Sequence, residues 1–369
     1  MVPYIPVSRP SIGDKEVSYV NDAVRSGWVS SLGPFIEQFE KRFAEFCGTR
    51  YALTASNGTT ALHLALVASG IKRGDEVIVP DLTFVATANA VSYIGARPVM
   101  VDIDSETLCI APDAIEKAIT SHTRAIVPVH LYGHPADMDP INKIAKQHGL
   151  CVIEDAAEAH GAEYRGRRVG GLGLCGVFSF YGNKVITTGE GGMITTDDET
   201  VFKTAKRLRD HAMSATKRYW HEEIGYNYRM TNLQAALGVA QMERIDEFMA
   251  KRREIMGWYR TGLEKHPRLR LNRDADWALN AYWMICVEVE GMNDAKRQSL
   301  MTSLRNRGVD SRPYFYPMSD MPMYPDTATP VAHRFSEAGL NLPSYVDLTE
   351  KDVQFICAQF ELALQEVNA

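Results

Sequence analysis

Apolar and polar positions alternate along the first two thirds of the chain in a way that predicts strands and helices in turn. Short apolar runs bounded by turn residues predict buried strands at 76–80, 98–102, 125–130 and 150–155, with shorter ones at 177–180 and 192–196. Stretches with helical spacing of apolar residues lie between them, at 61–69, 111–118 and 138–147. Because strands joined by helical crossovers pair in parallel, the pattern predicts an open α/β sheet.

An earlier helix is expected near the start of the chain. The stretch 34–46 places Phe35, Phe39, Phe43 and Phe46 on one face, and the proline that opens it suits a first helical turn.

The last third of the chain carries a different pattern. One long helical stretch at 233–260 leads to a strand at 282–289, a helix at 294–306 and a closing helix at 350–367. We therefore expect a large domain at 1–245 and a smaller C-terminal α+β domain at 246–369.

Composition and charge narrow the classes of function. Of the 369 residues, 45% are hydrophobic and 23% are charged, as in an ordinary globular protein. The net charge of −6 argues against nucleic acid as a partner, because phosphate backbones need a basic surface. No apolar run has the length of a signal peptide or a membrane span, so we expect a cytoplasmic protein without a membrane partner. The six cysteines lack metal-ligand spacing, and we expect buried free thiols and no metal.

A lysine among small residues is the first candidate for chemistry. Lys184 follows Gly182 and Asn183 and precedes a run rich in glycine and threonine, between two predicted strands. Most lysines in loops are simply solvated. A lysine that forms a Schiff base needs instead an amine that can lose its proton near neutral pH, through burial or nearby positive charge. On this segment alone, both interpretations stay open.

Residues at the ends of other predicted elements could complete one ligand site. Asp155 ends a strand, where it could cap a helix or keep a pyridine nitrogen protonated. The run from Ser56 to Thr59 opens a helix, where backbone N–H groups are either capped or bind phosphate. Phe84 follows the predicted strand at 76–80 and could fill the core or stack on a planar ring. Ligands of open α/β sheets bind at the carboxyl ends of strands, so together these residues predict a site for a flat, phosphorylated, nitrogen-containing ring beside a reactive amine.

These motifs resemble those of the DegT/DnrJ/EryC1/StrS sugar aminotransferases. The likeness covers nearly the whole chain and rests on residues 58–62, 83–84, 154–155, 179–184 and 225–230. It implies the fold of type I pyridoxal phosphate (PLP) enzymes, similar to aspartate aminotransferase, with a mixed, mainly parallel sheet. It also implies a homodimer with shared active sites, L-glutamate as amino donor and a nucleotide-sugar substrate. Within the family, the motifs look most like those of enzymes that aminate C4 of GDP-4-keto-6-deoxy-D-mannose.

The resemblance also implies roles for individual residues. Lys184 would bind PLP as a Schiff base and then move the proton during transamination. Asp155 would pair with the pyridine nitrogen, and Phe84 would cover the ring. Glu158 would contact the ring hydroxyl oxygen, and Arg229 would bind the carboxylate of the amino donor. The phosphate would be held by Gly58, Thr59 and Ser179 of the same chain and by Asn227 of the partner subunit.

Two positions bear on the choice of substrate. Glu158 stands where many relatives have glutamine, so a carboxylate faces a phenolate-like oxygen and one of the two should hold a proton. Ser319 departs from the histidine that relatives often show there, in an expected substrate loop.

Alternative functions stay open at this point. The sugar could be linked to UDP or dTDP instead of GDP. A related 3-dehydratase has histidine in place of the lysine, and Lys184 counts heavily against it. A non-catalytic PLP-binding protein usually carries an added DNA-binding domain, for which we expect no residues to be left over. The literal dinucleotide motif at 171–176 follows a polar turn and precedes a strand, so we do not expect a nicotinamide site there.

Overall fold

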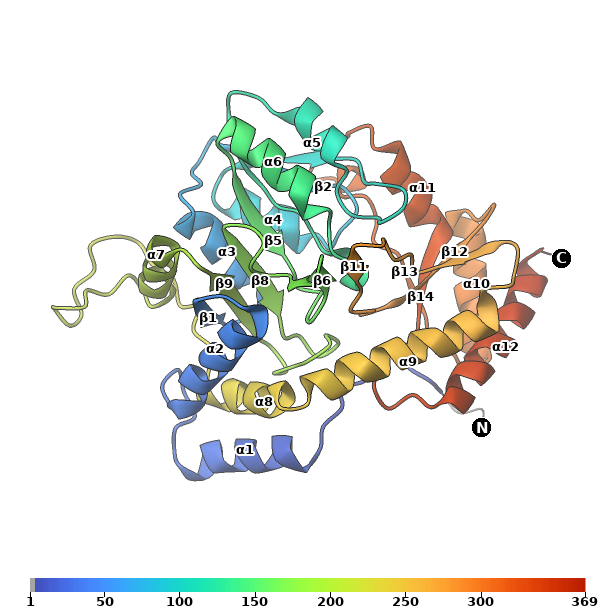
Figure 1. The fold of residues 1–369 in the computed structure, drawn as a ribbon, viewed down its shortest axis with the longest axis horizontal. Helices are drawn as coiled ribbons and strands as arrows, with labels where there is room; N and C mark the ends of the chain where they lie inside the picture. Colours follow the sequence, from blue (N-terminus) through green and yellow to red (C-terminus); the bar gives the residue numbers. More distant parts are fainter. Residues whose placement is uncertain (1–3, 369) are drawn as a thin grey trace.

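The computed structural model describes residues 4–368, which form a layered α/β body and a smaller C-terminal part with its own antiparallel sheet (Figure 1). The strands of the central sheet are β1 (Tyr51–Ala55), β2 (Glu76–Pro80), β3 (Arg97–Val101), β4 (Thr123–Ile126), β5 (Cys151–Asp155), β8 (Cys175–Ser179) and β9 (Gly192–Thr196). The helices of this body are α1 (Asp14–Arg25), α2 (Pro34–Cys47), α3 (Gly58–Ala68), α4 (Ala86–Tyr93), α5 (Pro112–Ala118), α6 (Met138–His148), α7 (Glu199–Arg209) and α8 (Asn232–Met242), with the short 3-10 turn η1 (Leu131–Gly133).

The central sheet has the order β1-β9-β8-β5-β4-β2-β3. Strand β9 runs antiparallel to both of its neighbours, and the other pairs are parallel. This confirms the predicted mixed, mainly parallel sheet. Each predicted strand of this region is present, with bounds that shift by a few residues, while β1 was not predicted.

Both faces of the sheet are covered by helices, which explains why its strands read as continuous apolar runs. On one face Val77 and Val79 of β2 pack in a core with α3, α4 and α7. On the other face Ile78 packs in a core with α2, α5 and α6. The aromatic face predicted for α2 lies in this second core, where Phe43 is 4.8 Å from Phe178 between ring centroids.

The prediction of one long helix at 233–260 is wrong in one respect, because the segment forms two helices. Helix α8 ends at Met242 and α9 (Ile245–Leu263) begins three residues later. Both junction residues are held by ion pairs, Glu243 to Lys15 and Arg42, and Arg244 to Glu16. The apolar spacing continues across the junction, so the sequence pattern alone does not show the break.

The C-terminal part is an antiparallel sheet of order β10-β12-β14-β13 packed against helices. Helix α9 runs from the central body to this part, where α12 lies beside it (Figure 1). The predicted strand at 282–289 is shorter than expected, because Tyr282 has a left-handed backbone (φ 48°) and β12 starts at Ile285. The elements here are β10 (Leu269–Leu271), β11 (Ala278–Leu279), β12 (Ile285–Val289), α10 (Asp294–Asn306), β13 (Arg312–Pro313), the 3-10 turn η2 (Met318–Asp320), α11 (Pro330–Ala338), β14 (Gly339–Leu342) and α12 (Glu350–Asn368).

The predicted domain boundary at 245/246 stays a prediction. Residues of α9 pack in two cores, Phe248 and Met249 in that of the large body and Ile255 and Tyr259 in that of the C-terminal part. A third small sheet, β11-β6-β7, pairs β11 with the hairpin of β6 (Glu163–Tyr164) and β7 (Arg167–Arg168).

Three chemical features of the described residues bear on the predictions from composition. Within 4–368, no helix is long and apolar enough to cross a bilayer. All six cysteines are free, and five are buried. In the same part of the chain, no group of three or more histidine, cysteine, aspartate or glutamate side chains is arranged to hold a metal ion.

Candidate active site

A cavity of about 700 Å³ opens at the carboxyl ends of the parallel strands. Its wall combines the start of α3, the ends of β5 and β8, the segment that leads from β2 into α4, and three residues of the C-terminal part. Most of the predicted site residues line it together, namely Gly58, Thr59, Phe84, Asp155, Glu158, Ser179 and Lys184. The sequence argument that strand ends converge on one site therefore matches the arrangement of these side chains.

Lys184 lies in the connection between β8 and β9, with only 12% of its side chain exposed. Its Nζ is 3.6 Å from Oε1 of Glu158 and lies 3.8 Å from the centroid of the Trp283 ring. Burial lowers the pKa of the Lys184 amine, while the carboxylates of Glu158 and Asp155 act in the opposite direction. This is the environment that a lysine needs to become a nucleophile, rather than that of a solvated loop lysine.

Glu158 shares its environment with this amine. It is 3% exposed, and its Oε2 accepts a hydrogen bond of 2.9 Å from the backbone N–H of Tyr132. Burial raises the pKa of Glu158 to about 7, against the opposing effect of Lys184. A carboxyl group with this pKa can hold or release a proton near neutral pH, directly beside the reactive amine.

Asp155 is the last residue of β5 and is 7% exposed. Its Oδ2 accepts a hydrogen bond of 2.8 Å from the Thr87 hydroxyl, and its Oδ1 accepts one of 3.2 Å from the Ala157 N–H. Burial raises the pKa of Asp155. A cationic partner in the cavity would compensate that burial, and the protonated nitrogen of a pyridine ring is such a partner.

The N-terminus of α3 forms a tight cup beside Ser179. Asn57 caps the helix by accepting from Thr60 N–H, which leaves the preceding N–H groups of the first turn without an intrahelical partner. A Cβ on Gly58 would lie 2.7 Å from the Cβ of Ser179, so only glycine fits between the helix start and the end of β8. Free N–H groups at a helix N-terminus favour a phosphate.

Aromatic side chains form the open side of the cavity. Phe84 lines it with 54% of its surface exposed, and its ring centroid is 5.9 Å from that of Phe315. An exposed phenylalanine in a concave wall is available to cover a planar ligand.

Two predicted site residues lie elsewhere in their own chain. Asn227 is exposed in the segment between α7 and α8, where it forms a β-bridge with Asp210. The Arg229 guanidinium forms an ion pair of 2.8 Å with the same aspartate. Neither residue lines the cavity.

The cavity residues that the C-terminal part contributes were not found from the sequence: Trp283, Arg312 and Phe315. They come from the C-terminal part and reach the cavity through contacts between distant segments. For example, the Trp283 indole N–H donates to the carbonyl of Asn183, and the Phe315 N–H donates to the Tyr132 hydroxyl. No local pattern marks these residues, because contacts between segments that are distant in the sequence bring them to the cavity.

Ser319 does not line the cavity. It is 5% exposed, and both its N–H and its hydroxyl donate to Asp81, at 2.8 and 2.7 Å. Asp81 also accepts from the Thr329 hydroxyl, so this buried carboxylate ties the segment after β13 to the end of β2. Ser319, which the sequence placed in an expected substrate loop, therefore attaches that loop to the large body through Asp81.

The glycine-rich motif at 171–176 has its backbone donors occupied. The carboxylate of Glu154 accepts from the N–H groups of Gly170, Leu172 and Gly173 at 2.7–2.8 Å. These donors are not available to a pyrophosphate, which agrees with the local pattern around the motif.

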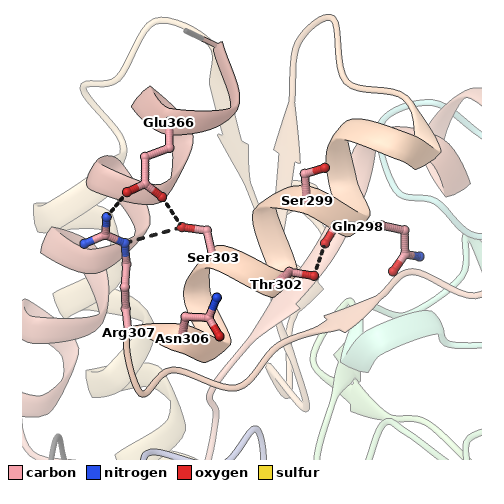
Figure 2. A pocket seen from close by; sticks show the side chains of 7 residues that line it. All are labelled: Gln298, Ser299, Thr302, Ser303, Asn306, Arg307 and Glu366. Carbon is pink, nitrogen blue, oxygen red and sulfur yellow. Dashed lines mark hydrogen bonds and ion pairs between the residues drawn. The ribbon is translucent and has the colours of Figure 1, made fainter.

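A second depression lies between α10 and α12 (Figure 2) and shares no lining residue with the cavity around Lys184. Arg307 and Ser303 both contact the carboxylate of Glu366, and these hydrogen bonds lower the pKa of Glu366. Its charged groups are paired with each other, Arg307 is half-buried and Glu366 is exposed, as on an ordinary solvated helix surface.

Comparison with known proteins decides the family. The profile of the DegT/DnrJ/EryC1/StrS aminotransferase family matches residues 10–361. The chain belongs to this family. It is 47% identical to GDP-perosamine synthase of Caulobacter vibrioides over 368 residues, covering 98% of this chain and 99% of the relative. It is 45% identical to GDP-perosamine synthase of Escherichia coli O157:H7, covering 96% and 97%.

Solved structures agree with this assignment. DesV of S. venezuelae is 35% identical, with a TM-score of 0.91 and coverage of 98% of this chain and 99% of that one. A protein named as a sugar aminotransferase from Streptococcus pneumoniae, in its PLP form, is 28% identical with a TM-score of 0.94, covering 99% of each chain. The protein is therefore a PLP-dependent sugar aminotransferase, as the sequence motifs predicted.

The residues of the cavity fit this cofactor. The glycine at the start of α3 leaves room for a phosphate, a buried carboxylate is placed to face a cationic ring nitrogen, and the lysine has a partly buried amine. When bound, PLP supplies an aldehyde carbon that takes up the amino group and a ring that withdraws electrons from it.

Proposed function

We propose that this enzyme moves the amino group of L-glutamate to C4 of GDP-4-keto-6-deoxy-D-mannose, giving GDP-perosamine for a surface polysaccharide such as the O-antigen. The observation that carries the aminotransferase chemistry is the meeting of the Lys184 amine with the carboxyls of Glu158 and Asp155 in one cavity. The choice of sugar is supported by the identity of 42–47% with relatives named GDP-perosamine synthase.

We infer the following roles from the geometry. Lys184 attaches the cofactor and carries the proton, and the carboxyl of Glu158 beside it faces the ring hydroxyl. Asp155 holds the proton on the pyridine nitrogen, and its orientation is fixed by Thr87. Phe84 covers the ring. The phosphate binds at Gly58, Thr59 and Ser179, where the helix dipole favours negative charge.

The carboxylate of the amino donor needs a cation, and Arg312 is placed to supply it. Arg312 lines the cavity, and within residues 4–368 its guanidinium forms no hydrogen bond or ion pair. Arg229, the residue implied by resemblance, is engaged by Asp210 instead. We therefore propose that Arg312 binds the carboxylate of the amino donor, as a second candidate in addition to Arg229.

We also propose that two copies of the chain share their active sites. The segment between α7 and α8 projects away from the body (Figure 1) and exposes apolar side chains, with Ile224 at 87% and Tyr219 at 75% exposure. Exposed apolar groups of this size mark a binding surface. Asn227 of the partner subunit would then reach the phosphate, which explains why Asn227 does not line the cavity of its own chain.

The substrate assignment is tested with a panel of nucleotide keto-sugars. Purified protein is supplied with PLP and L-glutamate, and kcat/KM is measured by product mass for GDP-4-keto-6-deoxy-D-mannose and for UDP- and dTDP-linked 4-keto-sugars. We expect the GDP-linked sugar to give the highest value, and a higher value for another nucleotide would contradict the proposal. Lys184→Ala should abolish both covalent attachment of the cofactor and turnover, whereas Lys203→Ala on the exposed face of α7 should leave both intact.

A further inference from the structure

Trp283 touches both the reactive amine and the backbone that carries it. The side chain is 4% exposed and comes from the segment between β11 and β12, outside the sheet that bears Lys184. Its ring face lies 3.8 Å from Nζ of Lys184, and its indole N–H donates to the carbonyl oxygen of Asn183 at 2.8 Å. The ring and the N–H group of one side chain thus contact the amine of Lys184 and the backbone carbonyl just before it.

The backbone around Trp283 is held in a costly arrangement. Tyr282 has a positive φ of 48°, which is rare for an aromatic residue. The guanidinium of Arg252, 2% exposed, donates to the carbonyl oxygens of Tyr282 and Trp283 at 3.2 and 3.0 Å. The same guanidinium also donates to the Ser344 hydroxyl at 3.1 Å. Burying a cation without a carboxylate partner costs free energy, so this arrangement fixes the segment at the expense of stability.

The same segment also packs against the turn η1. A Cβ on Gly133 would lie 2.8 Å from the backbone nitrogen of Tyr282 and 3.0 Å from that of Trp283. The ring of Tyr132 stacks on that of Trp283 at 6.3 Å, and Tyr132 also has a positive φ, of 53°. Because the Tyr132 N–H donates to Glu158, η1 positions both groups that flank the Lys184 amine.

We propose that Trp283 is a positioning residue for Lys184, holding the amine against Glu158 through its ring face and holding the lysine loop through its indole N–H. This inference rests on the proposed function of Lys184. The ring face packs on the amine and limits the directions in which it can point, and the hydrogen bond to the Asn183 carbonyl fixes the point from which the side chain extends. In the chemical step that this positioning serves, the neutral Nζ would bond to the aldehyde carbon of bound PLP, and the two amine protons would leave with the aldehyde oxygen as water.

The test compares two ligands on protein freed of cofactor. Pyridoxine 5′-phosphate has no aldehyde, so its Kd reports the cavity alone, whereas PLP also reports the amine. Attachment of PLP is followed by absorbance, and borohydride reduction with peptide mass mapping identifies the modified lysine. The variants are Trp283→Leu, which loses ring and N–H, and Trp283→Phe, which keeps a ring. The matched control is Trp258→Leu, which removes a lysine–tryptophan contact of 4.2 Å on α9 outside the cavity.

Because the amine would no longer be held in place, we expect Trp283→Leu to slow attachment of PLP about tenfold, while the Kd of pyridoxine 5′-phosphate stays unchanged. Trp283→Phe should lie between Trp283→Leu and the wild type, and Trp258→Leu should match the wild type. Attachment by Trp283→Leu at the wild-type rate would overturn the inference, and so would an equal loss for both ligands, which indicates a merely structural role. A wild-type protein that never attaches PLP at Lys184 would overturn the proposed function itself, together with the role of Trp283.

Discussion

The side chains around Lys184 are buried to a degree that makes their protonation part of the stability of the fold. His160 is fully buried and packs against the rings of Phe43, Phe178 and Phe180. Burial lowers the pKa of His160 to about 3, and the positive charges of Lys184 and Arg252 act in the same direction. This imidazole is therefore neutral in the folded protein under ordinary conditions.

This histidine should make the protein sensitive to acid. The pKa of His160 is lower in the folded protein than its ordinary value of 6.5. Above pH 6.5 the imidazole is neutral in both the folded and the unfolded state. As the pH falls from 6.5 toward 3 only the unfolded state takes up the proton, so the free energy of unfolding decreases. His160→Phe keeps an aromatic ring without the titration. Between about pH 7 and about pH 4.5 we expect the variant to lose about 3 kcal/mol less free energy of unfolding than the wild type. Urea unfolding at both pH values measures this, and parallel losses in the two proteins would contradict it.

A second prediction at this scale separates the two arginines proposed for the amino donor. Arg312→Gln should raise the KM for L-glutamate by about tenfold to a hundredfold, the usual effect of losing a hydrogen bond to a charged group. The KM for the nucleotide sugar should change little. Arg229→Gln is the comparison, because that guanidinium already pairs with Asp210. If only Arg229→Gln raised the KM for glutamate, the assignment of Arg312 would be wrong.

Secondary-structure elements place the site, and the start of α3 is the most tightly constrained of them. Gly58→Ala would put a Cβ 2.7 Å from the Cβ of Ser179, which has no flexible end that can move away. We expect the helix start to shift and the Kd for PLP to rise about tenfold or more, since the phosphate contacts depend on its position. Fluorescence or absorbance titration of cofactor-free protein measures that Kd.

The matched control for this substitution is Gly257→Ala in α9. Apart from the adjoining backbone of its own helix, no atom lies within 4 Å of the Cβ that it would add. Alanine in an open helical position stabilises by about 1 kcal/mol relative to glycine, so this variant should bind PLP normally and unfold at the same or a higher temperature. Unchanged PLP affinity in Gly58→Ala would show that the cup tolerates a side chain.

The elements also show where sequence reasoning works and where it stops. The strand at 192–196 and the aromatic helix after Pro34 were predictable, because each is defined by local spacing that tertiary contacts do not change. The break between α8 and α9 was not predictable, because it depends on ion pairs with α1 and α2. In the same way, Lys184 and Asp155 stand in recognisable motifs, whereas Trp283 reaches the cavity by a contact across 100 residues of sequence.

At the scale of the whole molecule, the segment between α7 and α8 is one of the described parts that expose several large apolar side chains. Its base is fixed to the body, since the Tyr228 hydroxyl bonds to His63 Nδ1 at 3.0 Å and the Tyr226 ring stacks on that of Tyr228. Beyond this base, Trp220 and Ile224 are exposed. A rigid base with an apolar tip suits insertion against a second copy related by a two-fold axis, in which each chain completes the site of the other.

Mixing two inactive variants tests this arrangement. In a dimer with shared sites, Lys184→Ala and Asn227→Ala each damage every site of their homodimers. A hybrid dimer has one site with both substitutions and one with neither, because Lys184 of one chain meets Asn227 of the partner subunit. Random reassociation should then restore about a quarter of the wild-type activity, since half of the dimers are hybrids with one intact site of two. Activity is measured after denaturing and refolding the variants together, and each variant refolded alone is the control. If the mixture stays as inactive as its components while size-exclusion chromatography shows hybrid dimers, Asn227 serves its own chain and the sites are not shared.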